Sequence, residues 1–309
     1  MRSYHLGLNL LCIILVLSAC NQDESIVQQS TPNFLTKKVI IISIDGPRLT
    51  ESWTSATEEN IPNQRNMATQ GVFFDNFYNE GTTKTMSGHS AITTGRYETI
   101  ANDGSELPFH HSIFQQFLST TLLPPEKSWI IGSKAKLAAL GDTKDLDWRG
   151  SFSPRIDTED RADAETILIA LQVLKEYSPI LSLIHFKEPD TYGHANNWEK
   201  YKASIRATDE YVQEIWDYIQ SDPFYRDQTA LFITNDHGRH LDGIGTGFVG
   251  HGDKCEGCRH ISLLALGPDF DKNKIVSDTY GQIDIAPTIA KLLGMEWEGE
   301  GEPITELVK

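Results

Sequence analysis

Residues 39–46 read Val-Ile-Ile-Ile-Ser-Ile-Asp-Gly, a nearly continuous run of β-branched residues that ends in an aspartate and a glycine. Such a run predicts a strand that is buried on both faces, as in a parallel sheet. In open α/β sheets, ligands bind beyond the carboxyl ends of the strands, so Asp45 lies where chemistry is expected. The alternative interpretation of Asp45 is an ordinary turn residue before a glycine.

Two later stretches repeat this pattern, and helical segments lie between them. Residues 180–186 and 230–235 are apolar runs of strand length, and residues 159–177 and 200–219 carry apolar side chains at helical spacing. Strands that alternate with helices predict an α/β fold. We therefore expect a mostly parallel central sheet with helices on both faces.

The stretch from residue 81 to residue 96 is the candidate functional centre. It reads Gly-Thr-Thr-Lys-Thr-Met-Ser-Gly-His-Ser-Ala-Ile-Thr-Thr-Gly-Arg. Thr85 suits the entrance of a helix and Gly95 suits its end. A hydroxyl at a helix N-terminus lies where backbone N–H groups and the macrodipole favour an anion, so it could attack a phosphoryl group. The alternative is a polar loop that caps an ordinary helix.

The first nineteen residues have the features of an export signal. Arg2 precedes an apolar core, residues 8–17, that is short for a membrane-spanning helix. The residues that end in Cys20, Leu-Ser-Ala-Cys, resemble the lipobox of bacterial lipoproteins. This resemblance implies a lipoprotein signal peptide over residues 1–19, lipidation of Cys20, and an exported protein anchored in a membrane and facing the periplasm or the cell surface. An uncleaved anchor and a simple secretory signal are the alternatives.

The rest of the chain divides into a tether and one domain. Residues 20–35 are polar and suit a flexible tether, and residues 36–309 are expected to form a single catalytic domain. The formal net charge of -16 argues against nucleic acid as a partner and against electrostatic docking on anionic lipid. An anionic substrate therefore needs local cations, which metal ions can supply.

Acidic and histidine residues follow each of the three apolar strands. They are Asp45, Asp190, His194, Asp236, His237 and, in a later glycine-rich loop, His251. A parallel sheet brings these strand ends to one edge, where mixed Asp and His ligands suit Zn²⁺, or Mn²⁺ where oxygen dominates. Two ions about 4 Å apart can clamp the attacking and leaving oxygens of a displacement and activate a nearby hydroxyl.

Two further histidines bear on this ligand set. His240 is the alternative to His251, and the glycines around His251 favour His251 because they allow close backbone approach. His185 lies inside a strand pattern and is interpreted as a buried structural histidine.

The motifs resemble those of the alkaline phosphatase superfamily, in particular its type I phosphodiesterase and nucleotide pyrophosphatase branch. The matching motifs are Ile42-Ser-Ile-Asp-Gly46, Lys84-Thr85-x-x-x-His89 with Thr93-Thr94-Gly95, Glu188-Pro-Asp-x-x-Gly-His194, Asn235-Asp-His-Gly238 and Gly250-His251-Gly252. Residues 281–294 also resemble the helix that closes the fold of sulfatase-like members. The resemblance implies an alkaline phosphatase-like fold over almost the whole chain after the tether.

The resemblance also implies two divalent metal ions with separate ligand sets. One set is Asp190, His194 and His251. The other set is Asp45, Asp236, His237 and the Thr85 oxygen. Thr85 would be the nucleophile of a phosphoric ester hydrolase, either a phosphodiesterase or a phosphomonoesterase, and would form a phosphothreonine that water then hydrolyses. A small phosphate ester is the implied substrate.

One departure from the pattern concerns substrate binding. The diesterase branch usually has Pro-Asn before the motif histidine, whereas this chain has Ser87-Gly88. The asparagine amide that helps to hold a phosphoryl oxygen is therefore missing, and Lys84, His89 or a backbone amide is the candidate replacement. Arg48 is a further candidate for contact with a substrate anion, and an ordinary surface arginine is the alternative. Monoester and diester substrates both stay open.

Three other functions remain as alternatives. A sulfatase-like hydrolase is disfavoured, because such enzymes need a modified Cys or Ser nucleophile and bind one Ca²⁺. A phosphotransferase of the same superfamily would pass the phosphoryl group to an alcohol, and the residues do not separate it from a hydrolase. A lipid-anchored binding protein without turnover is the third alternative. The oligomeric state is left open.

The sequence has two cysteines after Cys20, in the motif Cys255-Glu-Gly-Cys258. In an exported protein a local disulfide is the expected state of such a pair. The alternative is half of a zinc site, completed by His260 and His251.

Overall fold

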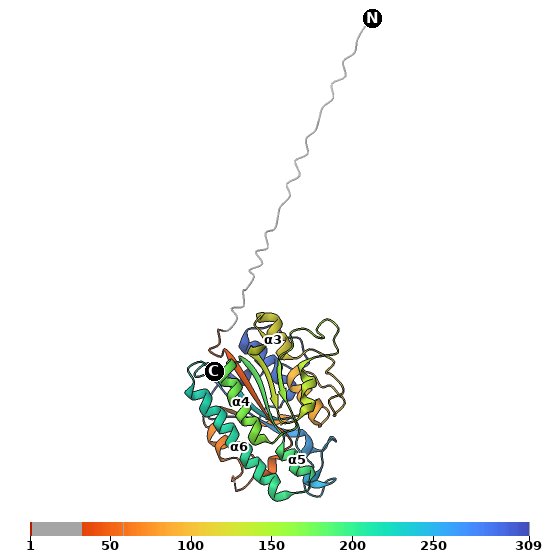
Figure 1. Ribbon diagram of the computed structural model, residues 1–309, viewed down its shortest axis with the longest axis vertical. Helices are drawn as coiled ribbons and strands as arrows, with labels where there is room; N and C mark the ends of the chain where they lie inside the picture. Colours follow the sequence, from red (N-terminus) through yellow and green to blue (C-terminus); the bar gives the residue numbers. More distant parts are fainter. Residues whose placement is uncertain (2–32, 58, 309) are drawn as a thin grey trace. The chain divides into compact units, whose positions relative to one another are not determined.

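The computed structural model describes Met1 and residues 33–57 and 59–308 (Figure 1). Asn33–Lys309 forms one compact unit. The predicted signal peptide, Cys20 and most of the predicted tether lie outside the described residues. Among the helices that are described, none combines the length and the apolar character needed to cross a membrane.

A nine-stranded sheet forms the centre of the domain. Its order is β4-β3-β5-β1-β6-β7-β2-β8, and β9 pairs with β2. The strands are β1 (Lys38–Ile44), β2 (Val72–Tyr78), β3 (Ser128–Gly132), β4 (Arg155–Thr158), β5 (Leu181–Phe186), β6 (Thr229–Asn235), β7 (His260–Leu266), β8 (Lys274–Val276) and β9 (Tyr280–Gly281). Of the strands in the described part of the chain, β7 alone runs against the others. The prediction of a mostly parallel sheet is confirmed.

The strand with the β-branched run, β1, lies between β5 and β6. All of its residues are buried, because both faces of the sheet are covered. Its last residue, Ile44, pairs with Phe186 of β5 and with Asn235 of β6. The three chain segments that follow these strands therefore leave the sheet at the same level and on the same edge.

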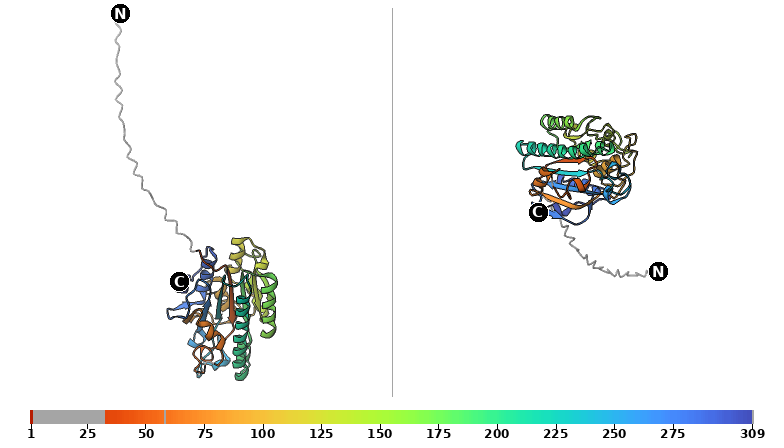
Figure 2. Two further views of the ribbon diagram at one scale, coloured as in Figure 1. Left: turned by 90° about the vertical axis from the view of Figure 1, so that its left-hand side faces the viewer. Right: turned by 90° about the horizontal axis from the view of Figure 1, so that it is seen from below.

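Helices cover both faces of this sheet, as predicted. The helices are α1 (Pro62–Ala68), α2 (Thr85–Thr94), α3 (Ile113–Thr121), α4 (Asp163–Tyr177), α5 (Glu188–His194), α6 (Trp198–Ser221), α7 (Glu256–Arg259) and α8 (Ile285–Leu293). Buried side chains of α2, α3 and α8 share one hydrophobic cluster with the sheet, and those of α1, α4 and α6 share another. Figure 2 shows α4 and α6 lying together over one face of the sheet.

The main differences from the predicted elements occur at the edges of the sheet. β4 lies in a stretch from which no element was predicted, and its residues are exposed or half-buried, so it has no apolar run to reveal it. β8 and β9 are only three and two residues long. These elements do not contribute to the site.

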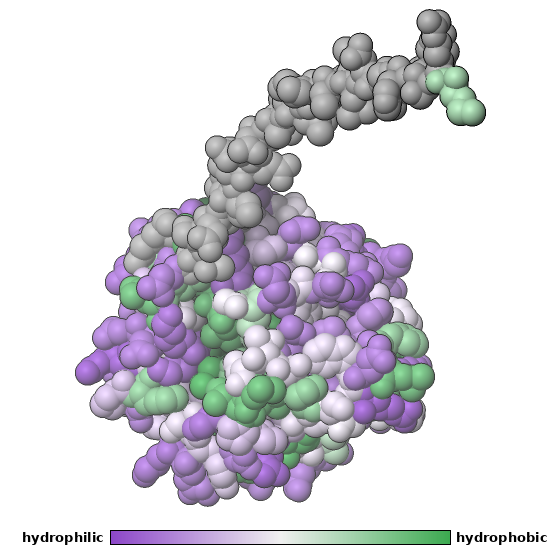
Figure 3. All heavy atoms as spheres, turned by 90° about the horizontal axis from the view of Figure 1, so that it is seen from above, coloured by the Kyte–Doolittle hydropathy of each residue, from purple (hydrophilic) through white to green (hydrophobic). Residues whose placement is uncertain are grey.

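The surface at the α3 end of the domain is mixed in character. Figure 3 shows hydrophobic side chains in patches among hydrophilic ones on this face. Exposed hydrophobic residues follow directly after α3, where Leu122 is 79% exposed.

Candidate metal centre

The carboxyl ends of β1, β5 and β6 bring three aspartates together. Asp45 follows β1 and Asp236 follows β6, and both are fully buried, whereas Asp190 in α5 is 4% exposed. Asp163 fixes the start of α5, because its carboxylate accepts the Lys187 and Glu188 N–H groups at 2.9 and 2.8 Å. The position of Asp190 is thus set both by the strand and by a cap on the helix.

The first ligand group consists of Asp190, His194 and His251. His194 is one helical turn after Asp190, and its Nε2 lies 3.2 Å from Asp190 Oδ1. His251 Nε2 lies 3.3 Å from the same oxygen and 2.9 Å from His194 Nε2. His251 Nδ1 is 2.8 Å from the Thr83 carbonyl, which can only accept a hydrogen bond, so Nε2 is left free to bind a metal.

The second ligand group consists of Asp45, Asp236 and His237. His237 Nε2 lies 3.4 Å from Asp45 Oδ1 and 3.3 Å from Asp236 Oδ2. His237 Nδ1 contacts the Gly238 carbonyl at 2.9 Å, which again directs Nε2 towards the carboxylates. The His237 ring stacks on the ring of His251, with centroids 3.7 Å apart, so the two groups adjoin.

The second group fits a divalent cation. Asp45 Oδ1, Asp236 Oδ2 and His237 Nε2 are buried, and none has a hydrogen-bond partner within the described part of the chain. Buried polar atoms without partners are unfavourable, and these three face one another with the ligand chemistry that Zn²⁺ takes. The arrangement agrees with the ligand set that the sequence implied for this ion.

Thr85 is the first residue of α2, with Lys84 at the N-cap position. Every residue of α2 is buried, and the helix ends at Gly95, whose φ of 64° is left-handed. The N–H of the second residue, Met86, donates to Asn102 Oδ1 at 3.0 Å. Thr85 therefore lies at the entrance of a helix, as predicted.

Lys134 is a site residue that the sequence analysis missed. Its Nζ lies 2.6 Å from Asp45 Oδ2, 2.7 Å from Asp190 Oδ2 and 3.4 Å from Thr85 Oγ1. Burial lowers the pKa of Lys134, but Asp45 and Asp190 raise it more strongly, so the net pKa is above its ordinary value and the amine stays charged. Lys134 follows the end of β3, so the rule that located the aspartates could have located it too.

Arg239 is a second missed residue. It is fully buried, and its guanidinium contacts Asp190 Oδ1 and the carbonyls of Phe248 and Val249, the latter at 2.7 Å. These two carbonyls lie just before His251 in the chain, so Arg239 connects Asp190 to the segment that carries this ligand. Its place directly after the Asp-His-Gly motif is the only signal for it in the sequence.

The two buried aspartates of the second group have opposite pKa shifts. Burial and Asp190 raise the pKa of Asp45, but Lys134 and a hydrogen bond to His185 Nε2 at 3.1 Å lower it below its ordinary value. Burial and the neighbouring Asp45 raise the pKa of Asp236 well above its ordinary value. The two carboxylates lie close together, and Asp45 Oδ1 and Asp236 Oδ2 have no hydrogen-bond partner among the described residues, so a cation between them would offset their repulsion. His185, interpreted as structural, supports Asp45.

The departure at Ser87-Gly88 has a steric reason. A Cβ on Gly88 would lie 2.4 Å from the Asp236 carbonyl oxygen, so only glycine lets α2 approach the end of β6 this closely. Ser87 Oγ accepts a hydrogen bond from the Ile100 N–H at 3.2 Å. Neither residue offers a side-chain amide in place of the missing asparagine.

His89 and Lys84 lie differently around Thr85. His89 is fully buried one turn below Thr85, and its Nδ1 is 2.7 Å from the Thr85 carbonyl. Burial and the nearby His185 lower the pKa of His89 to about 3, so this imidazole is neutral. Lys84 is exposed at the start of α2 and is the more accessible of the two candidates for substrate contact.

Two further candidates, Arg48 for substrate contact and His240 as the alternative metal ligand, make their side-chain contacts with residues outside the two ligand groups. Arg48 is 2% exposed, and its guanidinium is bound by Glu51 at 2.6 Å and by Asp242 at 2.8 Å. The alternative of an ordinary surface arginine is wrong, because the side chain is buried and both carboxylates bind it; a contact between Arg48 and substrate stays a prediction. His240 lies beside Asp253 rather than Asp190, so His251 is the histidine that joins the first group.

Family models match two parts of the chain. A model described as type I phosphodiesterase / nucleotide pyrophosphatase matches residues 39–100, and a model described as metalloenzyme superfamily matches residues 153–297. A protein in the alkaline phosphatase superfamily from Vibrio parahaemolyticus has the same fold, with a TM-score of 0.63 and 16% identity over 84% of this chain and 67% of that chain. The chain has the fold of the alkaline phosphatase superfamily, and its matches to the two family models agree with this likeness. The two matched segments contain Thr85 and all six of the Asp and His residues that were predicted as metal ligands.

Other solved structures and one curated relative are also similar. An inactive threonine-to-alanine variant of murine ectonucleotide pyrophosphatase / phosphodiesterase 5, in complex with AMP, matches 88% of this chain and 100% of that chain, with a TM-score of 0.67 and 14% identity. A phosphonate monoester hydrolase from Silicibacter pomeroyi matches 87% and 76%, with a TM-score of 0.63 and 14% identity. A 2,3-bisphosphoglycerate-independent phosphoglycerate mutase from Natronomonas pharaonis is 28% identical over 174 residues, which cover 55% of this chain and 32% of that protein. The chain thus spans about a third of the length of this relative.

Proposed function

We propose that this protein is a two-metal phosphoric ester hydrolase in which Thr85 is the nucleophile. The observation that carries the proposal is the set of three buried, unpartnered ligand atoms of Asp45, Asp236 and His237 in a cluster that adjoins a second Asp and His group. Such a pair of sites suits the displacement of a phosphate ester.

Each ligand group would hold one divalent ion. Asp190, His194 and His251 would bind the first, and Asp45, Asp236 and His237 would bind the second together with the Thr85 oxygen. The ions supply positive charge that favours ionisation of the Thr85 hydroxyl and stabilises the phosphoryl oxygens. We propose Zn²⁺, because imidazole nitrogens make up half of the six Asp and His ligands, with Mn²⁺ as the alternative.

The chain's own residues carry out the displacement. The Thr85 oxygen loses its proton and forms a bond to phosphorus as the bond from phosphorus to the ester oxygen breaks, and the leaving oxygen takes up a proton to depart as the alcohol. Water then hydrolyses the phosphothreonine, which releases phosphate from a monoester or a phosphate monoester from a diester. Lys134 Nζ, 3.4 Å from Thr85 Oγ1, remains charged and can stabilise negative charge on this oxygen or on the phosphoryl group. The N-terminus of α2 adds a favourable dipole at the same point.

The comparisons support this assignment in different ways. The murine phosphodiesterase relative is inactive as a threonine-to-alanine variant, which supports a threonine nucleophile. The phosphonate monoester hydrolase supports a phosphoester or phosphonate ester as the substrate class. The phosphoglycerate mutase favours phosphoryl transfer to an alcohol as a second candidate function.

The test is a comparison of Thr85→Ala with Thr85→Ser and Thr94→Ala on aryl phosphate monoester, phosphate diester, phosphonate and sulfate substrates. Thr85→Ala should lower turnover by at least about 10³-fold, as the loss of a nucleophile does, while its metal content stays near the wild-type value. Thr85→Ser keeps a hydroxyl and should retain part of the activity. Thr94→Ala, at the other end of α2, controls for helix stability. Wild-type turnover by Thr85→Ala would refute the nucleophile assignment.

We also propose that the protein is exported and anchored through lipid on Cys20, on the strength of the lipobox resemblance alone. Cys20→Ser should move the full-length protein from the membrane fraction to the soluble fraction. Unchanged membrane fractionation of the variant would contradict the anchor.

A further inference from the structure

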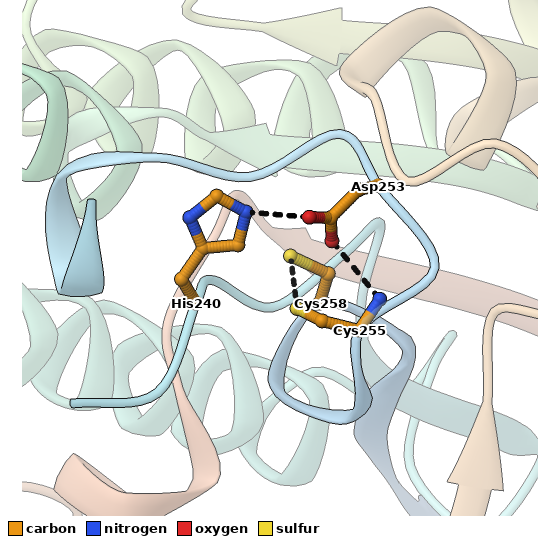
Figure 4. Close-up of side chains that lie close together, drawn as sticks. All are labelled: His240, Asp253, Cys255 and Cys258. Atoms are coloured by element: carbon orange, nitrogen blue, oxygen red, sulfur yellow. Dashed lines mark hydrogen bonds and ion pairs between the residues drawn. The ribbon is translucent and has the colours of Figure 1, made fainter. Parts of the chain in front are cut away.

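Four potential metal ligands lie together outside the centre described above: His240, Asp253, Cys255 and Cys258. One ligand atom from each lies within 4.8 Å of those of the other three, and Figure 4 shows the four side chains pointing towards one another. We propose that they bind a structural Zn²⁺ that fixes the loop carrying His251. This site shares no ligand with the two groups at the strand ends.

The distances suit a tetrahedral ion after a small expansion. His240 Nε2 lies 3.1 Å from Asp253 Oδ2, and the two cysteine sulfurs are 3.0 Å apart. Zn–S bonds of about 2.3 Å place two thiolates about 3.8 Å apart around a tetrahedral ion, so the sulfurs need to separate by less than about 1 Å. Two thiolates and an imidazole select Zn²⁺ over Mg²⁺, Ca²⁺ or Mn²⁺.

Backbone hydrogen bonds already hold the four ligands in place. Asp253 Oδ1 accepts the Cys255 N–H at 2.9 Å, and the Cys258 carbonyl accepts the Gly238 N–H at 2.8 Å. His240 donates its own N–H to the Gly250 carbonyl at 2.9 Å. The segments before and after the loop are therefore joined at the cluster without any contribution from the ion.

The remaining ring nitrogen of His240 has a partner that suits metal binding. Nδ1 lies 3.4 Å from Thr246 Oγ1, which can accept a hydrogen bond from the Nδ1–H group when Nε2 binds the ion. The Thr246 N–H is also directed at Nδ1, at 3.2 Å, so this N–H needs another acceptor once the ring changes tautomer. Zn²⁺ binding is thus expected to rearrange the loop locally at Thr246.

Access to the cluster is open on one side. The Asp253 side chain is 57% exposed, whereas that of His240 is 12% exposed and Cys258 is fully buried. An ion can therefore enter past Asp253 and be enclosed by the other ligands. Because the His240 and Cys258 side chains are enclosed by protein, their positions are fixed before an ion binds.

A metal ion at this cluster would stabilise the glycine-rich loop, residues 243–250, that lies between its ligands. Residues 243–250 contain four glycines, which lose more conformational entropy on ordering than other residues do. A cross-link from His240 to Asp253 closes this loop immediately beside His251. Thr83 reinforces the junction, since its hydroxyl donates to the Asp253 carbonyl at 2.7 Å and its carbonyl contacts His251.

The sequence predicted a disulfide between Cys255 and Cys258 or, alternatively, a zinc half-site with His260 and His251. The alternative zinc half-site with His260 and His251 does not form, because His260 Nε2 contacts the Asp75 carbonyl at 2.6 Å and His251 belongs to the first ligand group. The predicted disulfide between Cys255 and Cys258 stays a prediction, as both thiols are free in this structure. A disulfide and a Zn²⁺ site exclude each other, so one experiment decides between them.

The test is Co²⁺ titration of the reduced full-length protein, followed by near-ultraviolet absorption. Only thiolate ligands give the sulfur-to-cobalt charge-transfer band, and the strand-end centre has no cysteine. With Cys12 and Cys20 replaced by serine in every sample, the band therefore reports this cluster alone. The protein with all four cluster ligands intact should show the band, and Zn²⁺ should abolish it. Cys258→Ser should lose the band and one Zn²⁺ per chain, and Asp253→Asn, the milder change, should weaken Co²⁺ binding by at least tenfold. His260→Ala is the matched control and should keep the band.

Two results would overturn the proposal. One is the absence of the band from reduced protein in which the Cys255 and Cys258 thiols both react fully with a thiol reagent. The other is a protein isolated from its native compartment in which mass spectrometry finds Cys255 and Cys258 joined as a disulfide. Faster cleavage of residues 241–250 by protease in Cys258→Ser than in His260→Ala would support the role of the ion in fixing the loop.

Discussion

The two ligand clusters of this protein are built in opposite ways. The strand-end centre takes its ligands from segments between Asp45 and His251, and the sheet register places them together. The second cluster takes all of its ligands from one stretch between His240 and Cys258, and one of them is largely exposed. The position of the ligands in the strand-end centre therefore depends on the whole fold. An ion in the second cluster would restrict only the loop between His240 and Cys258.

The most direct test of this difference is to make the same Asp→Asn change in both clusters and to compare the effects on turnover. Asp236→Asn removes the charge of a buried ligand from the strand-end centre, and Asp253→Asn does so in the loop. Changes to outer partners of metal ligands typically cost 10–100-fold in activity, so Asp236→Asn should lower turnover by more than about 100-fold. Asp253→Asn should lower it by less than about tenfold, because Asp253 touches no ligand of the centre.

Turnover and bound metal are measured together for both variants. If Asp253→Asn proved as damaging as Asp236→Asn, the loop cluster would have to belong to the catalytic machinery, and the distinction between the two clusters would fall.

Lys134 offers a second, smaller test of what the sheet edge contributes. Lys134→Met keeps much of the side-chain volume but removes the charge between Asp45 and Asp190, and should lower turnover by about 10²-fold, as the loss of an electrostatic donor does. Lys136→Met is the matched control, since Lys136 Nζ bonds to the Asn102 carbonyl at 3.0 Å rather than to a carboxylate. Equal turnover by the two variants would remove Lys134 from the mechanism.

Gly88 gives the smallest expected effect, and it concerns packing. The added methyl of Gly88→Ala would meet the Asp236 carbonyl, and overpacking of this kind typically destabilises a protein by about 1–3 kcal/mol. Urea unfolding measures the loss, with Ser87→Ala as a control that adds no atoms. An unfolding free energy for Gly88→Ala within error of the wild type would show that α2 can move away from β6.

Much of the fold was predictable because the buried strands have a simple signature. The apolar runs of β1, β5 and β6 identified the centre of the sheet, and their ends identified Asp45 and Asp236. β4 escaped prediction because an exposed edge strand has no such run. Strands that are covered on both faces could therefore be predicted from the sequence, whereas the exposed edge strand β4 could not.

The candidate site was predictable for the same reason, with two exceptions. Asp45, Asp236 and His237 follow strand ends directly, so topology alone brings them together. Lys134 and Arg239 act through long side chains that reach back to Asp190, and their direction depends on packing that the sequence does not display. The burial of Arg48 and its ion pairs with Glu51 and Asp242 likewise depend on packing, so its position after β1 did not reveal them.

The stacked rings of His237 and His251 have a consequence for how strongly the two proposed metal ions affect each other's binding. Each ring belongs to a different ligand group, and their centroids are only 3.7 Å apart. An ion that fixes one ring limits the movement of the other, so the second ion meets a ligand that is already oriented. Binding of the two ions is therefore expected to be positively cooperative, with a coupling that acts equally in both directions. A metal-binding isotherm steeper than that of two independent sites would be its signature.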